Sequence, residues 1–314
     1  MIKSLQKMPV LQDCRPSVMK KPLPTINGVG PSCMRIMHNS GRSVIECLTR
    51  RFPGIAREAW ISRMKKGRVV DENGARLEPG STCRTGGYIY YYRELDEETP
   101  IPFEESILYR DDHILVADKP HFLAVVPSGR YLQETLLVRL KQKLMLDHLV
   151  PLHRIDRETA GLVIFSHNPE SRGKCASLFR ERRVWKIYEA LAPYAPDIQF
   201  PVERSSRIIA GKPFFRMDEE EGTPNAQTRI GIIETKDGIS RYRLEPLTGK
   251  KHQLRLHMAA LGIPIINDRI YPVTLPLAED DFSRPLKLVA RSVEFTDPLT
   301  GRPMRFESRI ELID

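Results

Sequence analysis

The chain has 314 residues, 41% of them hydrophobic, and carries a formal net charge of +9. That length and apolar content suit one large or two modest globular domains, and the positive charge favours a polyanionic partner such as nucleic acid over a role in solubility alone. The five cysteines are odd in number, widely spaced and without a Cys-x-x-Cys pair, which argues against a disulfide framework or a structural zinc site. No window is apolar enough for a transmembrane helix and the N-terminus is a poor signal peptide, so we expect a cytoplasmic protein with no membrane partner.

The first 105 residues are expected to form three segments. Residues 1–40 are rich in proline and poor in periodic apolar positions, and are predicted to be an extended arm. Residues 41–95 are predicted to be a small basic module, because the helical spacing of SVIECLTRRF and REAWISRMKKG precedes a strand–turn–strand pattern and the aromatic strand YIYYYR. Ser43 and Glu46 predict a capping box at the start of the first helix. Residues 96–105 are acidic, contain proline and are predicted to be a linker.

The charge of the module at residues 41–95 has two interpretations. Between Gly41 and Arg93, 11 Lys or Arg residues outnumber 5 Asp or Glu residues. Such an excess is typical of an RNA-binding surface, but it also occurs on a charged face that contacts only solvent.

Strand-like and helix-like segments alternate from residue 106 to residue 314. The expected strands include GLVIFSH, VWKIYEALA, PLKLVARSVEFTD and RPMRFESRIEL, and QTRIGIIETKDGISRYRLEPL predicts a hairpin that turns at residues 236–238. The segments ESRGKCASLFRERR and KHQLRLHMAALG have the apolar spacing of amphipathic helices. Adjacent strand pairs with scattered helices predict an α+β domain with a mixed, largely antiparallel central sheet flanked by helices.

Three polar clusters interrupt these apolar elements and are the candidates for chemistry. The cluster HRIDRETAG places Asp156 between Arg154 and Arg157 just before a strand, WKIYEALA carries Tyr188, and TGKKHQLRLH carries Arg255. An Asp–Arg pair can be structural, since buried charges need partners. It can also keep a carboxylate ionised for use as a nucleophile, and the residues alone leave both interpretations open.

No metal or cofactor site is expected. His252 and His257 lie five residues apart on a predicted helix, a rotation of about 140° beyond one full turn, so their rings should diverge. Two histidines that share a zinc ion on a helix are usually four residues apart. The sequence also lacks a Gly-x-Ser-x-Gly elbow, a dinucleotide-binding loop followed by a helix, and a Walker-type phosphate loop.

From about residue 104 to the C-terminus the chain resembles the RluA family of RNA pseudouridine synthases, with four motifs in the family's order. ILYRDDHILVADKP resembles the first motif, which ends in Lys-Pro, and HRIDRETAGL resembles His-Arg-Leu-Asp-x-x-Thr-Ser-Gly. WKIYEALA resembles the Lys-x-Tyr segment, and TGKKHQLRLHMAALGIPIINDRIY resembles Thr-Gly-Arg-x-His-Gln-Ile-Arg-x-His followed by Gly-x-Pro-Ile-x-Gly-Asp. Residues 41–93 resemble, in layout and charge, the small RNA-binding module of ribosomal-protein type that often precedes this domain.

The chain departs from the family pattern at a few positions. Ile155, Ala160, Lys250 and Asn267 stand where Leu, Ser, Arg and Gly are usual, and HFLAVVPSGRY lacks the usual His-Pro. These departures leave the aspartate, the tyrosine and the arginine of the motifs intact. They therefore bear on the identity of the substrate more than on activity.

The resemblance implies the pseudouridine synthase fold at residues 106–314 and a specific reaction. A uridine in structured RNA, either ribosomal large-subunit RNA or tRNA, would be isomerised to pseudouridine by a monomer that needs no cofactor and no metal. Whether the aspartate attacks the base or the sugar stays open at this point. The alternative is a non-catalytic RNA-binding or ribosome-assembly protein that retains the fold.

The resemblance also assigns roles to residues. Asp156 matches the catalytic aspartate, Arg255 the arginine that pairs with it, and Tyr188 the tyrosine that packs on the target base and is a candidate for proton transfer. Arg154 matches the arginine that helps to displace the target nucleotide from its stack. The residues expected to bind RNA are Arg154, Arg157, His153, Lys186, Lys250 and His252.

Overall fold

The computed structural model describes residues 23–37, 41–95, 97–276 and 279–312. The chain divides into two compact units, one that ends at Glu98 and also takes in Pro127–Gln133, and one formed by Thr99–Val126 and the chain from Glu134 onward. Each unit has its own sheet and its own core. No helix within the described ranges is both long enough and apolar enough to cross a membrane.

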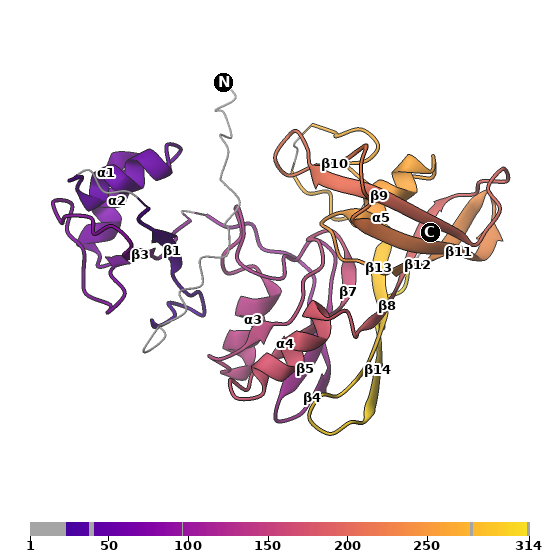
Figure 1. Cartoon of the computed structure of the whole chain (residues 1–314), viewed down its shortest axis with the longest axis horizontal. Coiled ribbons are helices and arrows are strands. Elements are labelled where there is room, and N and C mark those ends of the chain that lie inside the picture. The colour runs from indigo at the N-terminus through magenta and orange to yellow at the C-terminus, as the bar shows by residue number, and fades with distance from the viewer. Residues whose placement is uncertain (1–22, 38–40, 96, 277–278, 313–314) are drawn as a thin grey trace. The chain divides into compact units, whose positions relative to one another are not determined.

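The N-terminal unit packs two short helices beside a three-stranded antiparallel sheet (Figure 1). The sheet has the order β1 (Ser32–Arg35), β3 (Tyr88–Tyr91) and β2 (Val69–Val70), and the helices are α1 (Val44–Arg51) and α2 (Arg57–Lys65). Leu48 and Trp60 are fully buried in the core, as apolar positions at helical spacing should be. The backbone N–H of Ser43 donates to the Glu46 carboxylate at 2.8 Å, which confirms the expected capping box.

Two expected boundaries differ from the structure. Residues 32–35, which lie in the range expected to be an extended arm, form strand β1, because their backbone pairs with β3 and places Ser32 opposite Tyr91. Residues 1–22 of that range lie outside the described residues. Residues 99–105, expected to be part of a linker, belong to the C-terminal unit. Arg139 donates to the carbonyls of Ile101 and Phe103 at 2.8 and 2.6 Å, and Ile101 is buried. Extended backbone rich in proline can therefore still join a sheet edge or pack on a domain.

The C-terminal unit is built on one 11-stranded sheet, with the helices α3 (Leu136–Leu144), α4 (Arg172–Arg180) and α5 (Gln253–Ala260). Its main path has the order β10-β9-β11-β12-β8-β13-β7-β5-β4, while β14 pairs with β13 and β6 with β7. The strands are β4 (Ser106–Arg110), β5 (Ile114–Lys119), β6 (Val150–Pro151), β7 (Ala160–Ser166), β8 (Trp185–Pro193), β9 (Val202–Ala210), β10 (Met217–Glu220), β11 (Ala226–Lys236), β12 (Ile239–Pro246), β13 (Leu288–Thr296) and β14 (Pro303–Glu307). Within the described residues, β13 and β7 are the one parallel pair of neighbouring strands. The expected α+β fold with a mixed, largely antiparallel sheet is confirmed.

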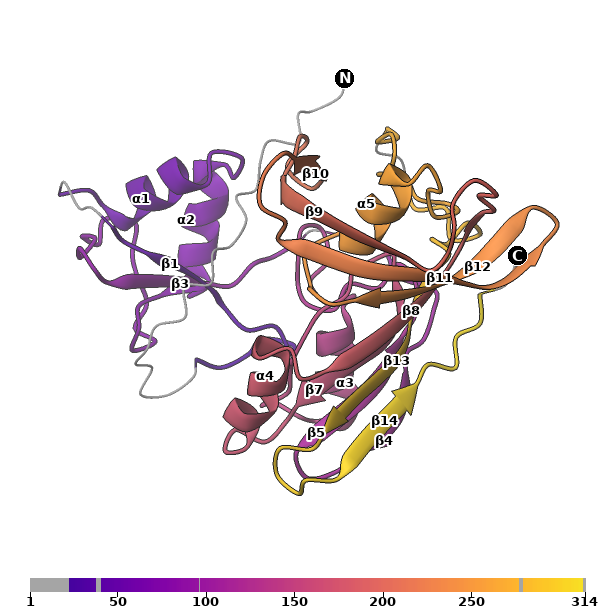
Figure 2. The ribbon, with the colours of Figure 1, turned by 45° about the vertical axis from the view of Figure 1, so that its right-hand side comes forward.

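Strands β8 and β13 run side by side through the middle of this sheet and connect its two halves (Figures 1 and 2). Helix α5 lies against the half that contains β10, β11 and β12. Helix α4 packs Cys175 and Leu178 on the other half, against β5 and β7. The expected hairpin is formed by β11 and β12, which turn at Asp237 and Gly238.

Gly161 allows β7 to lie beside β13. Its φ of +107° is in a region that L side chains rarely adopt, and a Cβ at this position would lie 2.4 Å from the carbonyl oxygen of Ala290. The two strands approach this closely because residue 161 has no side chain. The polar cluster HRIDRETAG ends at this crossing, so its side chains are held next to the middle of the sheet.

Candidate active site

The C-terminal unit contains a cavity of about 520 Å³, a volume typical of small-ligand sites. It is lined by the loop before β7, by the end of α4 and the start of β8, and by the segment that joins β12 to α5. The residues expected from the sequence that line it are His153, Arg154, Asp156, Lys186, Tyr188, Lys250, His252 and Arg255. The fold therefore brings together three polar clusters that are far apart in the sequence.

Arg255 is held rigidly at the base of this site. Its Nε and Nη2 each donate to one oxygen of Asp268 at 2.7 Å, and both side chains are 1% exposed. Asp268 also accepts the backbone N–H groups of Ile270 and Tyr271. The sequence pointed to Asp156 as the partner of Arg255, but the main partner is Asp268, since a planar guanidinium can place two donors on one carboxylate. Asp268 lies inside the last of the four motifs, yet nothing in the local pattern indicated that it faces Arg255.

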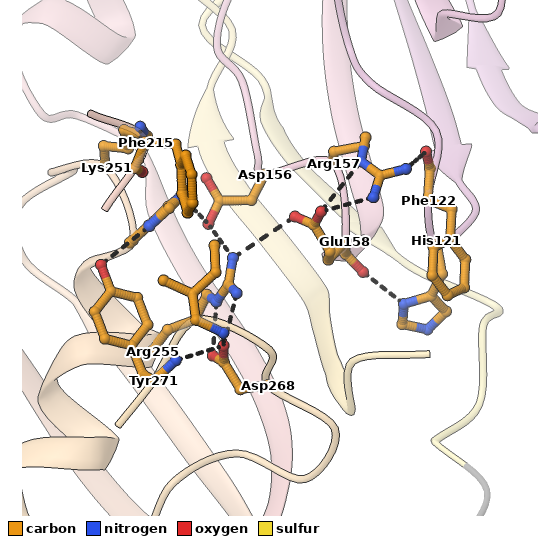
Figure 3. Close-up of polar contacts among 12 residues, drawn as sticks. His121, Phe122, Asp156, Arg157, Glu158, Phe215, Lys251, Arg255, Asp268 and Tyr271 are labelled. Carbon is orange, nitrogen blue, oxygen red and sulfur yellow. Dashed lines mark hydrogen bonds and ion pairs between the residues drawn. The ribbon is translucent and has the colours of Figure 1, made fainter. Parts of the chain in front are cut away.

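The remaining side of the Arg255 guanidinium faces two further carboxylates (Figure 3). Its Nη1 lies 3.6 Å from Oδ2 of Asp156 and 3.6 Å from Oε2 of Glu158. Nη1 is buried and has no hydrogen-bond partner within the described part of the chain. Burial opposes the charge of Glu158, but Arg255 and Arg157 outweigh that effect and lower the pKa of this carboxyl. Of the two carboxylates, Asp156 is the one that lines the cavity, and its side chain is 21% exposed.

Tyr188 lies on β8, opposite Ala290 of β13, and is half-buried. Burial, followed by the negative charge of Asp156, raises the pKa of its hydroxyl above the ordinary value. The phenol is therefore protonated at neutral pH. It can donate a hydrogen bond or support a stacked ring, but it is not a ready general base in the unliganded site.

His153 and His252 line the cavity, but their contacts are internal. The backbone N–H of Ile164 donates to Nε2 of His153 at 3.1 Å, and Nδ1 of His252 lies 3.1 Å from the hydroxyl of Tyr271. Burial lowers the pKa of His153 to about 3 and that of His252 to about 4. Both imidazoles are therefore neutral at physiological pH, so we no longer expect them to bind phosphate as cations.

Arg157 does not line the cavity, contrary to an RNA-binding role. Its Nη1 and Nη2 donate to the two oxygens of Asp280 at 2.9 and 2.8 Å. Its Nε donates to Glu158 at 3.1 Å, a contact drawn in Figure 3. A guanidinium with two carboxylate partners is already neutralised. These contacts hold Arg157 next to Asp156, an arrangement that the sequence alone could not distinguish from a contact with RNA.

Lys119 is a buried residue next to the site that the sequence did not single out, although it is the lysine of the Lys-Pro pair that ends the first motif. Its ammonium group is fully buried and donates to the carbonyls of Pro120 at 2.8 Å and Arg157 at 3.0 Å. Burial lowers its pKa to about 7. Lys119 thereby ties the end of β5 to the loop that carries Asp156.

The two histidines tested for a metal site take part in separate networks. His252 has a φ of +57° and precedes α5, so the helical rotation argued from the sequence does not apply to it. His257 is on the helix and contacts the hydroxyls of Thr228 and Ser206 at 2.9 and 3.0 Å. No cluster of three or more potential metal ligands occurs among the described residues.

Comparisons with known proteins add to this geometry. A family model described as RNA pseudouridylate synthase matches residues 113–260. The dual-specificity RNA pseudouridine synthase RluA of Haemophilus influenzae is 31% identical over 208 residues, which are 65% of this chain and 92% of that protein. The ribosomal large subunit pseudouridine synthase D of Pseudomonas aeruginosa is 28% identical over 288 residues, which are 85% of this chain and 88% of that protein.

A solved structure is similar as well. Human RNA pseudouridylate synthase domain containing 1 superposes with a TM-score of 0.54 at 25% identity, covering 68% of this chain and 86% of its own. The range matched by the family model contains Asp156, Tyr188 and Arg255, and it begins after Glu98, where the first segment of the N-terminal unit ends.

Proposed function

The chain belongs to the RluA family of RNA pseudouridine synthases, and on that premise we propose that Asp156 is its nucleophile, with its negative charge stabilised by Arg255. The protein is thus an isomerase that converts uridine in RNA to pseudouridine. The alternative of a binding-only protein is not favoured, because the comparisons are with enzymes.

The reaction exchanges one sugar–base bond for another. The bond between N1 of uracil and C1′ of ribose breaks, and C5 then joins to C1′. N1 gains a proton and C5 loses one, so the atoms balance without a redox reagent or a leaving group, and no cofactor is required. The chemistry needs a negative group at the junction of sugar and base, and an ionised carboxylate supplies it.

The observation that carries this proposal is the position of Arg255. Asp268 fixes the guanidinium, so Nη1 lies 3.6 Å from Asp156 before any substrate is present. At that distance the positive charge stabilises the carboxylate, while no hydrogen bond from a described residue occupies its lone pairs. A preorganised charge of this kind needs no rearrangement when the reaction begins, which is the usual source of electrostatic catalysis.

The other cavity residues have roles in presenting the base. A uracil inside structured RNA is out of reach until it is flipped out of its stack, which costs a few kcal/mol. Arg154 is exposed at the cavity and can fill the space that the nucleotide leaves. Tyr188 supplies a neutral aromatic surface for the extruded ring.

The substrate is a structured RNA, either ribosomal large-subunit RNA or tRNA. A relative named as a ribosomal large subunit pseudouridine synthase covers most of the chain, which supports the first. The basic N-terminal unit adds a second contact with RNA, since Arg50 and Arg51 are exposed in the last turn of α1. We expect a cytoplasmic monomer.

The test is pseudouridine mapping at single-nucleotide resolution in total RNA from a strain that lacks the gene. The strain is complemented with the wild type, with Asp156→Asn, or with Asp112→Asn, an exposed aspartate outside the cavity, as the matched control. We expect one or more sites to vanish and to return with the wild type and the control only. Restoration by Asp156→Asn would show that Asp156 is not the nucleophile, and the RNA that holds the site identifies the substrate.

A further inference from the structure

One part of the cavity lining carries positive charge that no carboxylate of the described residues neutralises. Arg182 and Lys186 both line the cavity. Neither side chain makes a hydrogen bond or an ion pair with another described residue. The neighbouring arginines differ, because Arg180 and Arg183 both pair with Glu181, at 3.5 and 3.0 Å. Of these four cations, the two that face the cavity are the two without a partner in the described part of the chain.

The backbone at the end of α4 fixes the position of Arg182. Its N–H donates to the carbonyl of Phe179 at 3.3 Å, and the N–H of Arg183 donates to that of Leu178 at 2.8 Å, the pattern of a Schellman motif. The φ of Arg182 is +56°, a left-handed conformation in which glycine or asparagine is usual because a longer side chain is strained. An arginine here is unfavourable for the helix end. The helix end itself gives no reason for an arginine at this position, whereas a ligand in the adjacent cavity would give one.

Lys186 lies close enough to Arg182 for their charges to oppose each other. It is half-buried, and burial, followed by the charge of Arg182, lowers the pKa of its ammonium group. The ammonium faces Gly249, where a Cβ would lie 4.0 Å from Nζ. Glu245 also lines the cavity, but Arg243 donates to it at 2.5 Å. An anion between Lys186 and Arg182 would offset both the burial and the repulsion.

We propose that Arg182 and Lys186 form a phosphodiester-binding subsite that holds the RNA backbone beside the target nucleotide. This subsite rests on the proposed function, because it assumes that the target uridine occupies the same cavity near Asp156. A phosphodiester fits the two cations, since a guanidinium can bind two phosphate oxygens and an ammonium acts as a point charge beside them. The contact reads no base, so it sets the position and direction of the strand and not its sequence.

The experiment measures binding of a short oligouridylate to the full chain over a range of salt concentrations. Arg182→Gln is expected to weaken binding about tenfold, as for the loss of one charged hydrogen-bonding partner. The slope of log K against log salt should become shallower by up to about 0.7, the value for one phosphate contact with a single strand. Lys186→Gln should have a similar effect, and the double variant should lose less than the sum, because both side chains contact one phosphate.

Two further variants control for folding and for general charge. Arg183→Gln removes the same charge one residue away, outside the cavity, and should bind as the wild type does. Arg182→Gly suits the left-handed conformation better, so its melting temperature should be at least that of the wild type while its binding is weakened like that of Arg182→Gln. Wild-type binding by Arg182→Gly would overturn the proposal, and so would equal losses in Arg182→Gln and Arg183→Gln.

The test of the phosphodiester subsite can fail or succeed independently of the test of the proposed function. If Asp156→Asn restores the modification while Arg182→Gln still weakens binding, the nucleophile is wrong and the phosphodiester subsite stands. If Asp156 is required but Arg182→Gln and Lys186→Gln bind and react as the wild type does, the subsite is wrong and the nucleophile stands.

Discussion

Asp268→Asn tests the proposal that a buried ion pair prepares the active site. Asparagine keeps one carbonyl oxygen but turns an NH2 group towards a guanidinium donor, so one of the two 2.7 Å contacts with Arg255 is lost and the arginine keeps a charge without its counterion. Removing one partner of a buried ion pair costs about 3–5 kcal/mol. We expect a loss of about 3 kcal/mol in the free energy of unfolding, at the lower end, because Asp156 and Glu158 still lie 3.6 Å from Nη1.

Activity should fall for a different reason. Without its clamp, Arg255 can move towards Asp156 and Glu158 until it reaches hydrogen-bonding distance, a shift of somewhat less than 1 Å from the present 3.6 Å. Displacement of a catalytic group by about 1 Å lowers rates by about a hundredfold. Urea unfolding followed by circular dichroism gives the stability. The rate of pseudouridine formation on the mapped RNA, measured at a temperature where the variant is folded, gives the activity.

A double variant separates the two effects. Arg255→Leu with Asp268→Leu replaces the buried pair by apolar groups, an exchange that is often neutral or stabilising, so most of the stability should return while the rate stays low. Glu307→Gln is the control for charge removal, because its pair with Arg305 is exposed to solvent and should contribute little to the free energy of unfolding. Wild-type stability together with a wild-type rate in Asp268→Asn would refute the reasoning.

Two further predictions concern residues that support the loop of Asp156. Asp280→Asn weakens the bidentate contact with Arg157, so kcat should fall about tenfold with little change in KM, and wild-type kinetics in this variant would contradict the positioning role. Lys119→Met should remove a pH dependence of stability. Because burial lowers the Lys119 pKa from 10.5 to about 7, the unfolded chain binds more protons between these values, and the wild-type free energy of unfolding should rise with pH by up to about 1.4 kcal/mol per unit there. Urea unfolding at several pH values in this window tests the prediction. An equal rise in the free energy of unfolding of Lys119→Met would show that another group is responsible.

Local patterns predicted the elements whose partners are near in sequence. The hairpin of β11 and β12 and the start of α1 at Ser43 are examples, since turn residues and a capping box act over a few positions. Strand β1 was missed because its partner β3 begins more than 50 residues later, and the local pattern of a proline-rich segment does not indicate such a pairing. Strands β9 and β10 were missed for a related reason, because VERSSRIIA and MDEE have few apolar residues and their partners define them.

The candidate site shows the same limit at the level of side chains. The motifs predicted which residues line the cavity, but they could not predict which charged residues form ion pairs with each other. Arg157 and Arg255 both appeared to serve Asp156, yet their main partners are Asp280, 123 residues from Arg157, and Asp268. Charge partners follow from the fold, and sequence proximity gives only candidates.

The charges of the site thus form two groups with different tasks. In the first group, Arg157 and Arg255 are neutralised by carboxylates of the chain, so neither side chain is free to move towards a phosphate when RNA binds. The electrostatic surroundings of Asp156 are fixed before the substrate arrives.

The second group consists of Arg154, Arg182, Lys186 and Lys250, which line the cavity without an ion pair to any described residue. RNA can bind to these cations without breaking a contact inside the protein, so their charge contributes to affinity and to its salt dependence. The fixed group contributes to the rate of the chemical step instead, because its interaction with Asp156 is present whether or not RNA is bound. Substitution of a residue of the first group should therefore change kcat more than KM, and substitution of a residue of the second group should change KM more than kcat. Arginine thus serves both purposes in one cavity.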